Sequence, residues 1–262
     1  MQKLYVIKIG GNVIDDEAAF NAFIKNFASI KAGKILVHGG GKLATRVAEA
    51  MGIPQQMVDG RRITDADTLK VVTMVYAGAI NKNIVAKLQQ EHTNAIGITG
   101  ADGNIIFAHK RQNAAIDYGY VGDVDGVNSG LVNVLLQQNI TLVCAPLTHD
   151  GKGNLLNTNA DTIAQEMAKA MSGHYDVSLI YCFEKNGVLK DANDDNSVIN
   201  TIDANSFEQL KSKGIISGGM IPKLQNAFAA IEAGVTDVSI GHAANLQQLI
   251  YKESGTLIQN GQ

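Results

Sequence analysis

Cysteine is scarce in this sequence of 262 residues, which contains only Cys144 and Cys182. Both lie within apolar runs, where a thiol usually packs as a small apolar side chain. The chain also lacks the C-x-x-C and H-E-x-x-H spacings that are typical of zinc sites. The sequence therefore predicts two buried thiols and gives little support for a structural zinc site.

Proline, excess basic charge and long apolar stretches are lacking as well. The three prolines are too few for a proline-rich linker. A formal net charge of -3 at pH 7 disfavours a nucleic-acid-binding protein, which usually presents a basic face. The apolar stretch 4–7 is too short for a signal peptide or a membrane span. We therefore expect a cytoplasmic protein without a membrane or nucleic-acid partner.

The sequence does contain a regular alternation of short β-branched runs and longer amphipathic segments. Several runs are apolar on both faces, as in parallel strands that are covered by helices on each side. We expect strands at 4–9, 34–38, 95–99, 105–108, 141–145, 177–182 and 235–240. We expect helices at 17–31, 42–51, 128–138, 159–171, 206–213, 221–233 and 244–251, and a long helix from a Thr64 cap to Leu88. This alternation predicts an α/β fold, a three-layer αβα sandwich with a mostly parallel central sheet.

The domain organisation is expected to be simple, because no repeat or low-complexity tract is apparent. A polar stretch at 172–176 follows the helical pattern 159–171 and marks a soft boundary. We expect a single domain, 1–262, with an N-terminal lobe 1–174 and a C-terminal lobe 175–262. The acidic segment 191–197 has adjacent rather than alternating acids, which favours a polar surface loop over a calcium loop.

Two glycine-rich turns follow the first two expected strands. Gly10 and Gly11 end the first strand, and residues 39–41 lie between the second strand and a helix. Glycine lets a ligand approach the backbone closely, and a helix N-terminus adds partial positive charge. Either turn alone is equally well explained as a tight turn. Two such turns at the carboxyl ends of early strands predict a ligand-binding edge of the sheet.

Three common motifs that use glycine are absent. The chain has no G-x-x-x-x-G-K-[ST] string of a P-loop and no G-x-G-x-x-G after the first strand. The His-Gly-Gly-Gly string at 38–41 resembles the oxyanion loop of some lipases, but no serine occupies a G-x-S-x-G frame. These absences argue against P-loop, dinucleotide-binding and esterase folds.

Three charged side chains, Lys8, Lys223 and Asp161, each allow a functional and a structural interpretation. Lys8 ends the first strand, where it either binds an anion or extends its charged end to solvent. Lys223 lies in the first turn of a helix, where its charge opposes the helix dipole unless an anion is bound; a solvated surface lysine is the alternative. Asp161 follows an Asn159 cap, where a carboxylate is favourable without any ligand.

An arginine pair, Arg61 and Arg62, precedes the long helix. One of the two guanidinium groups could bind a carboxylate through two parallel hydrogen bonds. An exposed arginine pair fits the pattern equally well, so these residues alone do not define a site.

Five segments together resemble the amino acid kinase superfamily, and most closely its acetylglutamate branch. They are Lys-Ile-Gly-Gly at 8–11, Val-His-Gly-Gly-Gly at 37–41, Gly-Arg-Arg-Ile-Thr at 60–64, Asn-Thr-Asn-Ala-Asp at 157–161 and Gly-Gly-Met-Ile-Pro-Lys at 218–223. The first two recur across the superfamily, and the last two are more specific to the branch. The resemblance covers nearly the whole chain, with the segments in order and at suitable spacing.

The resemblance implies an enzyme that transfers the γ-phosphoryl group of ATP to the side-chain carboxylate of N-acetyl-L-glutamate, in arginine biosynthesis. Another N-acyl-L-glutamate, such as the N-succinyl compound, would use the same catalytic residues. Mg²⁺ would bridge the ATP phosphates. Lys8 and Lys223 would neutralise the phosphoryl oxygens, and Asp161 would orient both lysines. This assignment needs no general base, because a carboxylate with a pKa of about 4.3 is already deprotonated at neutral pH.

The resemblance also implies the binding residues. Gly10 and Gly11 would contact the phosphoryl group, and Gly40 and Gly41 the phosphoryl group or the acyl-amino-acid. Arg62 would bind the α-carboxylate, and Asn157 would hold the amide region. The implied nucleotide contacts in the C-terminal lobe are Glu184, Asn186, Gly187, Leu189, Ile215 and Ser217. Family members commonly carry Asp-Val where this chain has Glu184 and Lys185, a departure that bears on side-chain contacts to ATP more than on backbone contacts.

A homodimer is the assembly that the resemblance implies, with the long helix after Thr64 as a reasonable contact. Arginine-inhibited members carry a helical extension before the first strand, and this chain begins almost at that strand, so we do not expect arginine inhibition. Two alternatives stay open at this point. One is a related kinase that acts on carbamate, aspartate, glutamate or a nucleotide monophosphate; the other is a non-catalytic sensor of an amino acid or nucleotide.

Overall fold

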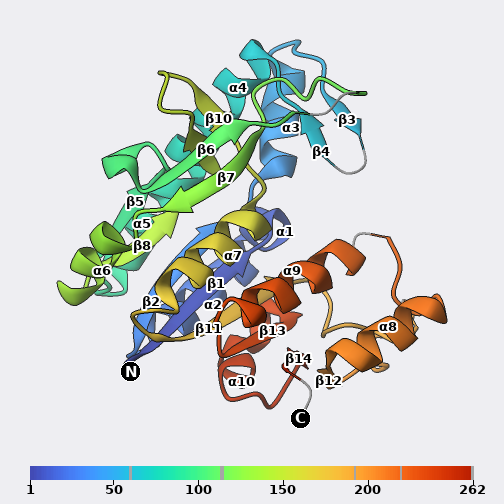
Figure 1. Ribbon diagram of the computed structural model, residues 1–262. Helices are drawn as coiled ribbons and strands as arrows, with labels where there is room; N and C mark the ends of the chain where they lie inside the picture. Colours follow the sequence, from blue (N-terminus) through green and yellow to red (C-terminus); the bar gives the residue numbers. More distant parts are fainter. Residues whose placement is uncertain (59–60, 113–114, 192, 219, 261–262) are drawn as a thin grey trace.

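The central element of the fold is an eight-stranded sheet (Figure 1). The computed structural model describes residues 1–58, 61–112, 115–191, 193–218 and 220–260, so the motif residues Gly60 and Gly219 lie outside it. The strand order is β12 (Thr201–Ile202), β14 (Thr256–Ile258), β13 (Asp237–His242), β11 (Asp176–Phe183), β1 (Lys3–Ile9), β2 (Gly33–His38), β8 (Thr141–Cys144) and β5 (Ala95–Ile98). Every neighbouring pair is parallel except β13 and β14. The predicted, mostly parallel sheet is therefore confirmed.

Helices cover both faces of this sheet (Figure 1). One face packs against α6 (Ser129–Gln137), α7 (Ala160–Met171) and α9 (Met220–Glu232), and the other against α2 (Glu17–Ala28), α5 (Asn81–Gln90) and α10 (Leu246–Ile250). In β1, Leu4 and Val6 belong to the first apolar core, whereas Ile7 and Ile9 belong to the second. This distribution confirms the three-layer sandwich, because alternate side chains of a strand point to opposite faces.

A smaller sheet of four strands lies beside the central sheet (Figure 1). Its order is β10 (Leu155–Asn157), β9 (Leu147–His149), β6 (Ile106–Lys110) and β7 (Gly122–Val127). The expected strand 105–108 thus exists, but it belongs to this second sheet. The other three strands have no counterpart in the prediction, since they are short or contain residues such as glycine and aspartate that disfavour strands. A separate hairpin joins β3 (Gln56–Val58) to β4 (Arg61–Ile63).

The predicted long helix is built from three consecutive segments. They are α4 (Ala66–Thr73), the π-helical η1 (Met74–Ile80) and α5. Asp65, not Thr64, caps the first segment, because its carboxylate accepts from the Thr68 backbone N–H at 2.7 Å. Thr64 is instead in extended backbone that bridges to Gly119. The prediction of a Thr64 cap was therefore wrong by one residue.

Further helices connect the strands of the described chain. They are α1 (Gly11–Asp15), α3 (Gly41–Ala50), α8 (Ala204–Ser212), η2 (Asp102–Asn104) and η3 (Ala243–Asn245).

Cys144 and Cys182 are buried in the central sheet, as predicted, and burial raises the pKa of each thiol to about 12. Within the described ranges, no helix has the length and apolar character that crossing a membrane requires.

Candidate active site

The two glycine turns meet at the carboxyl edge of the central sheet. They are adjacent because β1 and β2 are parallel neighbours, with Ile9 opposite His38. A Cβ atom on Gly11 would lie 3.6 Å from the Cα atom of Gly40. Gly40 has φ +155°, and a Cβ there would lie only 2.2 Å from Cδ1 of Ile80. This position therefore requires glycine, which brings backbone rather than side chains to the site.

The second turn opens α3, whose first-turn N–H groups have no side-chain cap. Gly40 is the N-cap residue, and it makes no capping hydrogen bond. Burial lowers the pKa of His38 to about 4, so the ring is neutral near pH 7. Its Nδ1 lies 2.8 Å from the Gly39 carbonyl oxygen, to which the neutral ring donates, and its Nε2 lies 3.2 Å from Nδ2 of Asn81. These contacts fix a turn that presents backbone N–H groups and the positive end of a helix dipole.

Lys8, Asp161 and Lys223 come together at the same edge. The Lys8 ammonium lies 2.8 Å from Oδ1 of Asp161, and the Lys223 ammonium donates to Oδ2 at 2.8 Å. The three side chains are mostly buried, with 14%, 22% and 16% of the Lys8, Asp161 and Lys223 side chains exposed. One carboxylate therefore holds two ammonium groups, and the cluster carries one net positive charge.

Local sequence accounts for each position in this cluster. Lys8 follows Leu4 and Val6 at steps of two along β1, so its side chain points to the face that α7 covers. Asp161 is the second residue of α7, and the Asn159 side chain caps this helix by accepting from the Asp161 and Thr162 N–H groups. Lys223 lies near the start of α9, which packs against α7. Asp161 thus lies in a capped first turn and contacts both lysines, and its role in catalysis stays a prediction.

The electrostatic balance of the cluster favours the charged carboxylate. Burial alone raises the pKa of Asp161, but the ammonium groups of Lys8 and Lys223 lower it by more. The pKa of Asp161 therefore lies far below its ordinary value. The carboxylate is therefore ionised at any physiological pH. The charged carboxylate in turn holds the Lys8 and Lys223 ammonium groups at a place where an anionic ligand could approach them.

A cavity of about 430 Å³ lies between this cluster and the smaller sheet. Its wall includes all four predicted substrate residues, namely Gly40, Gly41, Arg62 and Asn157, together with Asp161 and Lys223. Lys8 contacts the lining residue Asp161, and Gly11 approaches the lining residue Gly40. The structure thus brings the predicted catalytic and substrate residues around one space.

Arg62 is held firmly in the cavity wall. Its Nη2 donates to the Gly41 carbonyl oxygen at 3.0 Å and to Oγ1 of Thr45 at 2.8 Å, and its Nη1 donates to Oε1 of Gln55. Burial raises the pKa of the neighbouring Tyr76, and the Arg62 charge opposes that shift. The guanidinium group is therefore oriented before any ligand binds.

Asn157 lies on the opposite side, in the smaller sheet. It is the last residue of β10, and its Nδ2 donates to Oγ1 of Thr64 at 3.0 Å. The backbone N–H of Asn157 donates to the Tyr120 carbonyl oxygen at 2.8 Å. These two bonds hold the Asn157 carboxamide at the cavity. This position depends on the smaller sheet, which the sequence did not predict.

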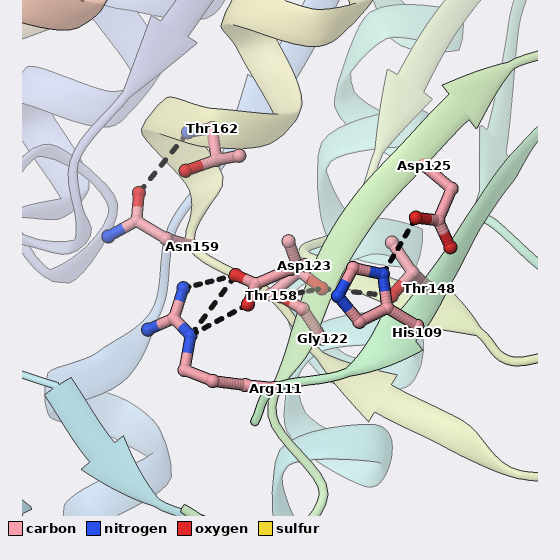
Figure 2. Close-up of polar contacts among 9 residues, drawn as sticks. All are labelled: His109, Arg111, Gly122, Asp123, Asp125, Thr148, Thr158, Asn159 and Thr162. Atoms are coloured by element: carbon pink, nitrogen blue, oxygen red, sulfur yellow. Dashed lines mark hydrogen bonds and ion pairs between the residues drawn. The ribbon is translucent and has the colours of Figure 1, made fainter. Parts of the chain in front are cut away.

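Sequence reasoning missed Arg111, which also lines the cavity. Figure 2 shows its guanidinium group bound to the carboxylate of Asp123, with Nε 3.1 Å and 3.0 Å from the two oxygens. This bond raises the pKa of Arg111, against the effect of burial. Nearby, Oγ1 of Thr158 lies 2.9 Å from Oγ1 of Thr148. Arg111 directly follows β6, and the β6–β7 pairing, with His109 opposite Asp123, brings its side chain near that carboxylate.

The predicted nucleotide residues do not line this cavity. Glu184, Asn186, Gly187 and Leu189 follow β11, and Ile215 and Ser217 lie exposed between α8 and α9. A Cβ atom on Gly187 would lie 2.8 Å from both Oγ1 of Thr256 and Cγ1 of Val198. Gly187 thus serves tight backbone packing, and a nucleotide role of these six residues stays a prediction.

The described residues also bear on where a metal ion would be held. They contain no cluster of three or more His, Cys, Asp or Glu side chains suited to a metal ion.

The fold and the paired lysines define the class of this protein. Residues 3–242 match the amino acid kinase family, and the chain belongs to that family. A relative from Cytophaga hutchinsonii named acetylglutamate kinase is 60% identical over 251 residues, which are 95% of each chain. A relative of the same name from Phocaeicola vulgatus is 55% identical over 258 residues, which are 98% of this chain and 99% of the relative.

The fold also occurs in proteins with a different activity. The structure of N-acetylglutamate synthase from Neisseria gonorrhoeae, complexed with coenzyme A and N-acetyl-glutamate, superposes with a TM-score of 0.84. It is 20% identical, and the match covers all of this chain but 60% of the longer synthase. At this identity the likeness shows the fold alone, so the activity must be argued from the site.

Proposed function

We propose that this chain transfers the γ-phosphoryl group of ATP to the side-chain carboxylate of N-acetyl-L-glutamate, giving the 5-phosphate, as a step of arginine biosynthesis. Membership of the amino acid kinase family and the two relatives named acetylglutamate kinase support this proposal. The observation that carries it is that Asp161 contacts two ammonium groups, those of Lys8 and Lys223. Asp161 and Arg62 line the same cavity.

The chemical obstacle in this reaction is charge, because a carboxylate must approach a polyphosphate. Lys8 and Lys223 together outweigh the Asp161 charge, so the cluster offers a net positive field at the reacting atoms. Fixed ammonium groups stabilise the charge that spreads over the phosphoryl oxygens in the transition state, without reorganising during the reaction. Asp161 would act by holding both ammonium groups in place, not as a base.

The remaining residues would bind and orient the acceptor. Arg62 would pair with the α-carboxylate, since its guanidinium group is already oriented at the wall. Asn157 would bind the amide region from the smaller sheet. The N–H groups of Gly11, Gly40 and Gly41 would donate to the phosphoryl group or the acceptor. Holding both partners in one cavity lowers the entropic barrier of the transfer.

The nucleotide would lie on the other side of the lysine cluster, against the predicted residues after β11 and between α8 and α9. Magnesium, when bound with ATP, would offset phosphate charge. The two-lobe division at residue 174, the homodimer, the helix contact within it and the cytoplasmic location are further predictions. Among the alternatives, a sensor without activity would have no need of two lysines on one buried carboxylate.

The test is a coupled ADP-release assay with magnesium and ATP. N-acetyl-L-glutamate, N-succinyl-L-glutamate, free glutamate and aspartate are supplied in parallel, with hydroxylamine to trap an acyl phosphate. We expect a trapped hydroxamate with N-acetyl-L-glutamate, and its absence from the Lys223→Ala variant excludes a contaminating kinase. Turnover of only a free amino acid would move the chain to a related kinase. A folded sample that binds ATP and turns over no acceptor would favour a sensor.

A further inference from the structure

Two aromatic rings lie against the Lys223 ammonium group. Its Nζ is 5.1 Å from the ring centre of Tyr181 and 5.7 Å from that of Phe183. Both distances are within the range of a cation–π contact, in which the negative face of a ring attracts a cation. The same ammonium group donates to Asp161, so it is held by one carboxylate and two rings.

The strand pattern of β11 places these rings. Leu179 and Tyr181 belong to the apolar core beneath α7 and α9, and Phe183 packs against that core at the end of the strand. Residues at steps of two share a face of the sheet, so the two rings are consecutive on the face that α9 covers. Tyr181 is 1% exposed and lies opposite Lys8 in the parallel register of β1 and β11.

Tyr181 contacts the aspartate as well as the lysine. Its hydroxyl donates to the backbone carbonyl oxygen of Asp161 at 3.3 Å, in the first turn of α7. One side chain therefore lies beside Lys8, beneath Lys223 and against the main chain of Asp161. Such a position links the three members of the cluster through the sheet itself.

We propose that Tyr181 and Phe183 are positioning residues that fix the Lys223 ammonium group for phosphoryl transfer. This inference rests on the proposed kinase function. A ring face attracts the ammonium charge without accepting a strong hydrogen bond, so the N–H groups that do not bind Asp161 stay available to phosphoryl oxygens. A second carboxylate at this place would cancel the charge, and an aliphatic side chain would remove water from it without compensation.

The test compares ring loss with ring retention. Tyr181→Leu and Phe183→Leu remove a ring, whereas Tyr181→Phe keeps the ring and removes only the hydroxyl. Phe23→Leu is the matched control, because Phe23 is a buried aromatic (1% exposed) in the core on the opposite face of the sheet. For each variant, kcat, the KM for the acyl-amino-acid and the melting temperature are measured with the full chain.

We expect Tyr181→Leu to lower kcat about tenfold, in keeping with the strength of a desolvated cation–π contact. Its KM should stay within about twofold, because Lys223 acts on the phosphoryl group rather than on acceptor binding. Tyr181→Phe should keep kcat within about threefold of the wild type. Phe23→Leu should lower the melting temperature and leave kcat unchanged.

A different result would overturn the inference. If Tyr181→Leu keeps kcat within the range of Phe23→Leu, the rings serve packing alone. If Tyr181→Leu does not fold, Phe183→Leu decides: a threefold loss of kcat at constant KM supports positioning, and a wild-type kcat refutes it. An inactive wild-type chain would instead refute the proposed function, so the two failures are distinguishable.

Discussion

The Lys223 ammonium group lies 2.8 Å from Oδ2 of Asp161, so α9 is joined to the start of α7 through an ion pair that faces the cavity. Lys8 takes the other oxygen of the same carboxylate, at the same distance, from the central strand β1. Three elements that are distant in the sequence thus deliver their charges to one point.

Removal of either lysine should slow the chemical step. We expect Lys8→Ala and Lys223→Ala each to lower kcat at least about a hundredfold, which is the scale of losing one charge contact in the transition state. Saturating ADP-release kinetics measure the effect. Lys3→Ala is the control for Lys8, since Lys3 lies on the same strand and pairs with Asp176 at 3.2 Å outside the cavity. A near-normal kcat in either variant would remove that lysine from the mechanism.

Arg62→Ala should raise the KM for the acyl-amino-acid more than it lowers kcat. The guanidinium group is fixed in the cavity wall by Gly41 and Thr45, so its contact with an α-carboxylate would exist in the ground state and the transition state alike. Initial rates at varied acceptor concentration give both constants, and Arg61→Ala serves as the neighbouring control. An unchanged KM in Arg62→Ala would assign the carboxylate to another residue.

Much of the fold was accessible from the sequence, because strands that are buried on both faces are continuous apolar runs. β1, β2, β8, β11 and β13 were predicted for that reason. The strands of the smaller sheet were not, since β7 reads Gly-Asp-Val-Asp-Gly-Val and is stabilised by pairing with β6 rather than by its own composition. The position of Arg111 depends on that pairing, so it was missed as well.

The candidate site could also be predicted in part from the sequence. Alternation along β1 directs Lys8 toward one face, and the Asn159 cap fixes Asp161 in the first turn of α7. No local rule states that α9 lies beside α7, so the contact between Lys223 and Asp161 followed from resemblance alone. Tyr181 lies within the expected strand 177–182 and Phe183 just beyond it, and only the packing of α9 shows that Lys223 lies above the two rings.

Acid should remove stability that depends on Asp161. Burial raises the pKa of this carboxyl, but the ammonium groups of Lys8 and Lys223 lower it by more, so the folded pKa lies below the unfolded value of about 3.9. Its contribution is therefore complete above about pH 4 and declines as the pH falls toward the folded pKa.

Urea unfolding of the wild type and Asp161→Asn at several pH values tests this sign. The stability advantage of the wild type should be largest above pH 4 and shrink as the pH falls below it. Glu166→Gln is a suitable control, because Glu166 lies on the same helix and pairs with Lys169 at 3.0 Å, whereas Asp161 pairs with Lys8 and Lys223. A constant difference between wild type and Asp161→Asn across this range would contradict the assigned shift.

Gly40→Ala should damage both stability and activity. The new Cβ atom would lie 2.2 Å from Cδ1 of Ile80, at a backbone φ of +155° that side chains rarely adopt. Relief of this clash would move the turn that opens α3, and with it the N–H groups expected to bind the phosphoryl group or the acceptor. We expect a lower melting temperature and a kcat reduced by at least about tenfold, as a small misplacement in an oriented site is costly. Gly173→Ala is the matched control, because a Cβ there meets nothing within 4 Å. Equal behaviour of the two variants would show that the turn adjusts to a side chain, and that its backbone geometry is not required for function.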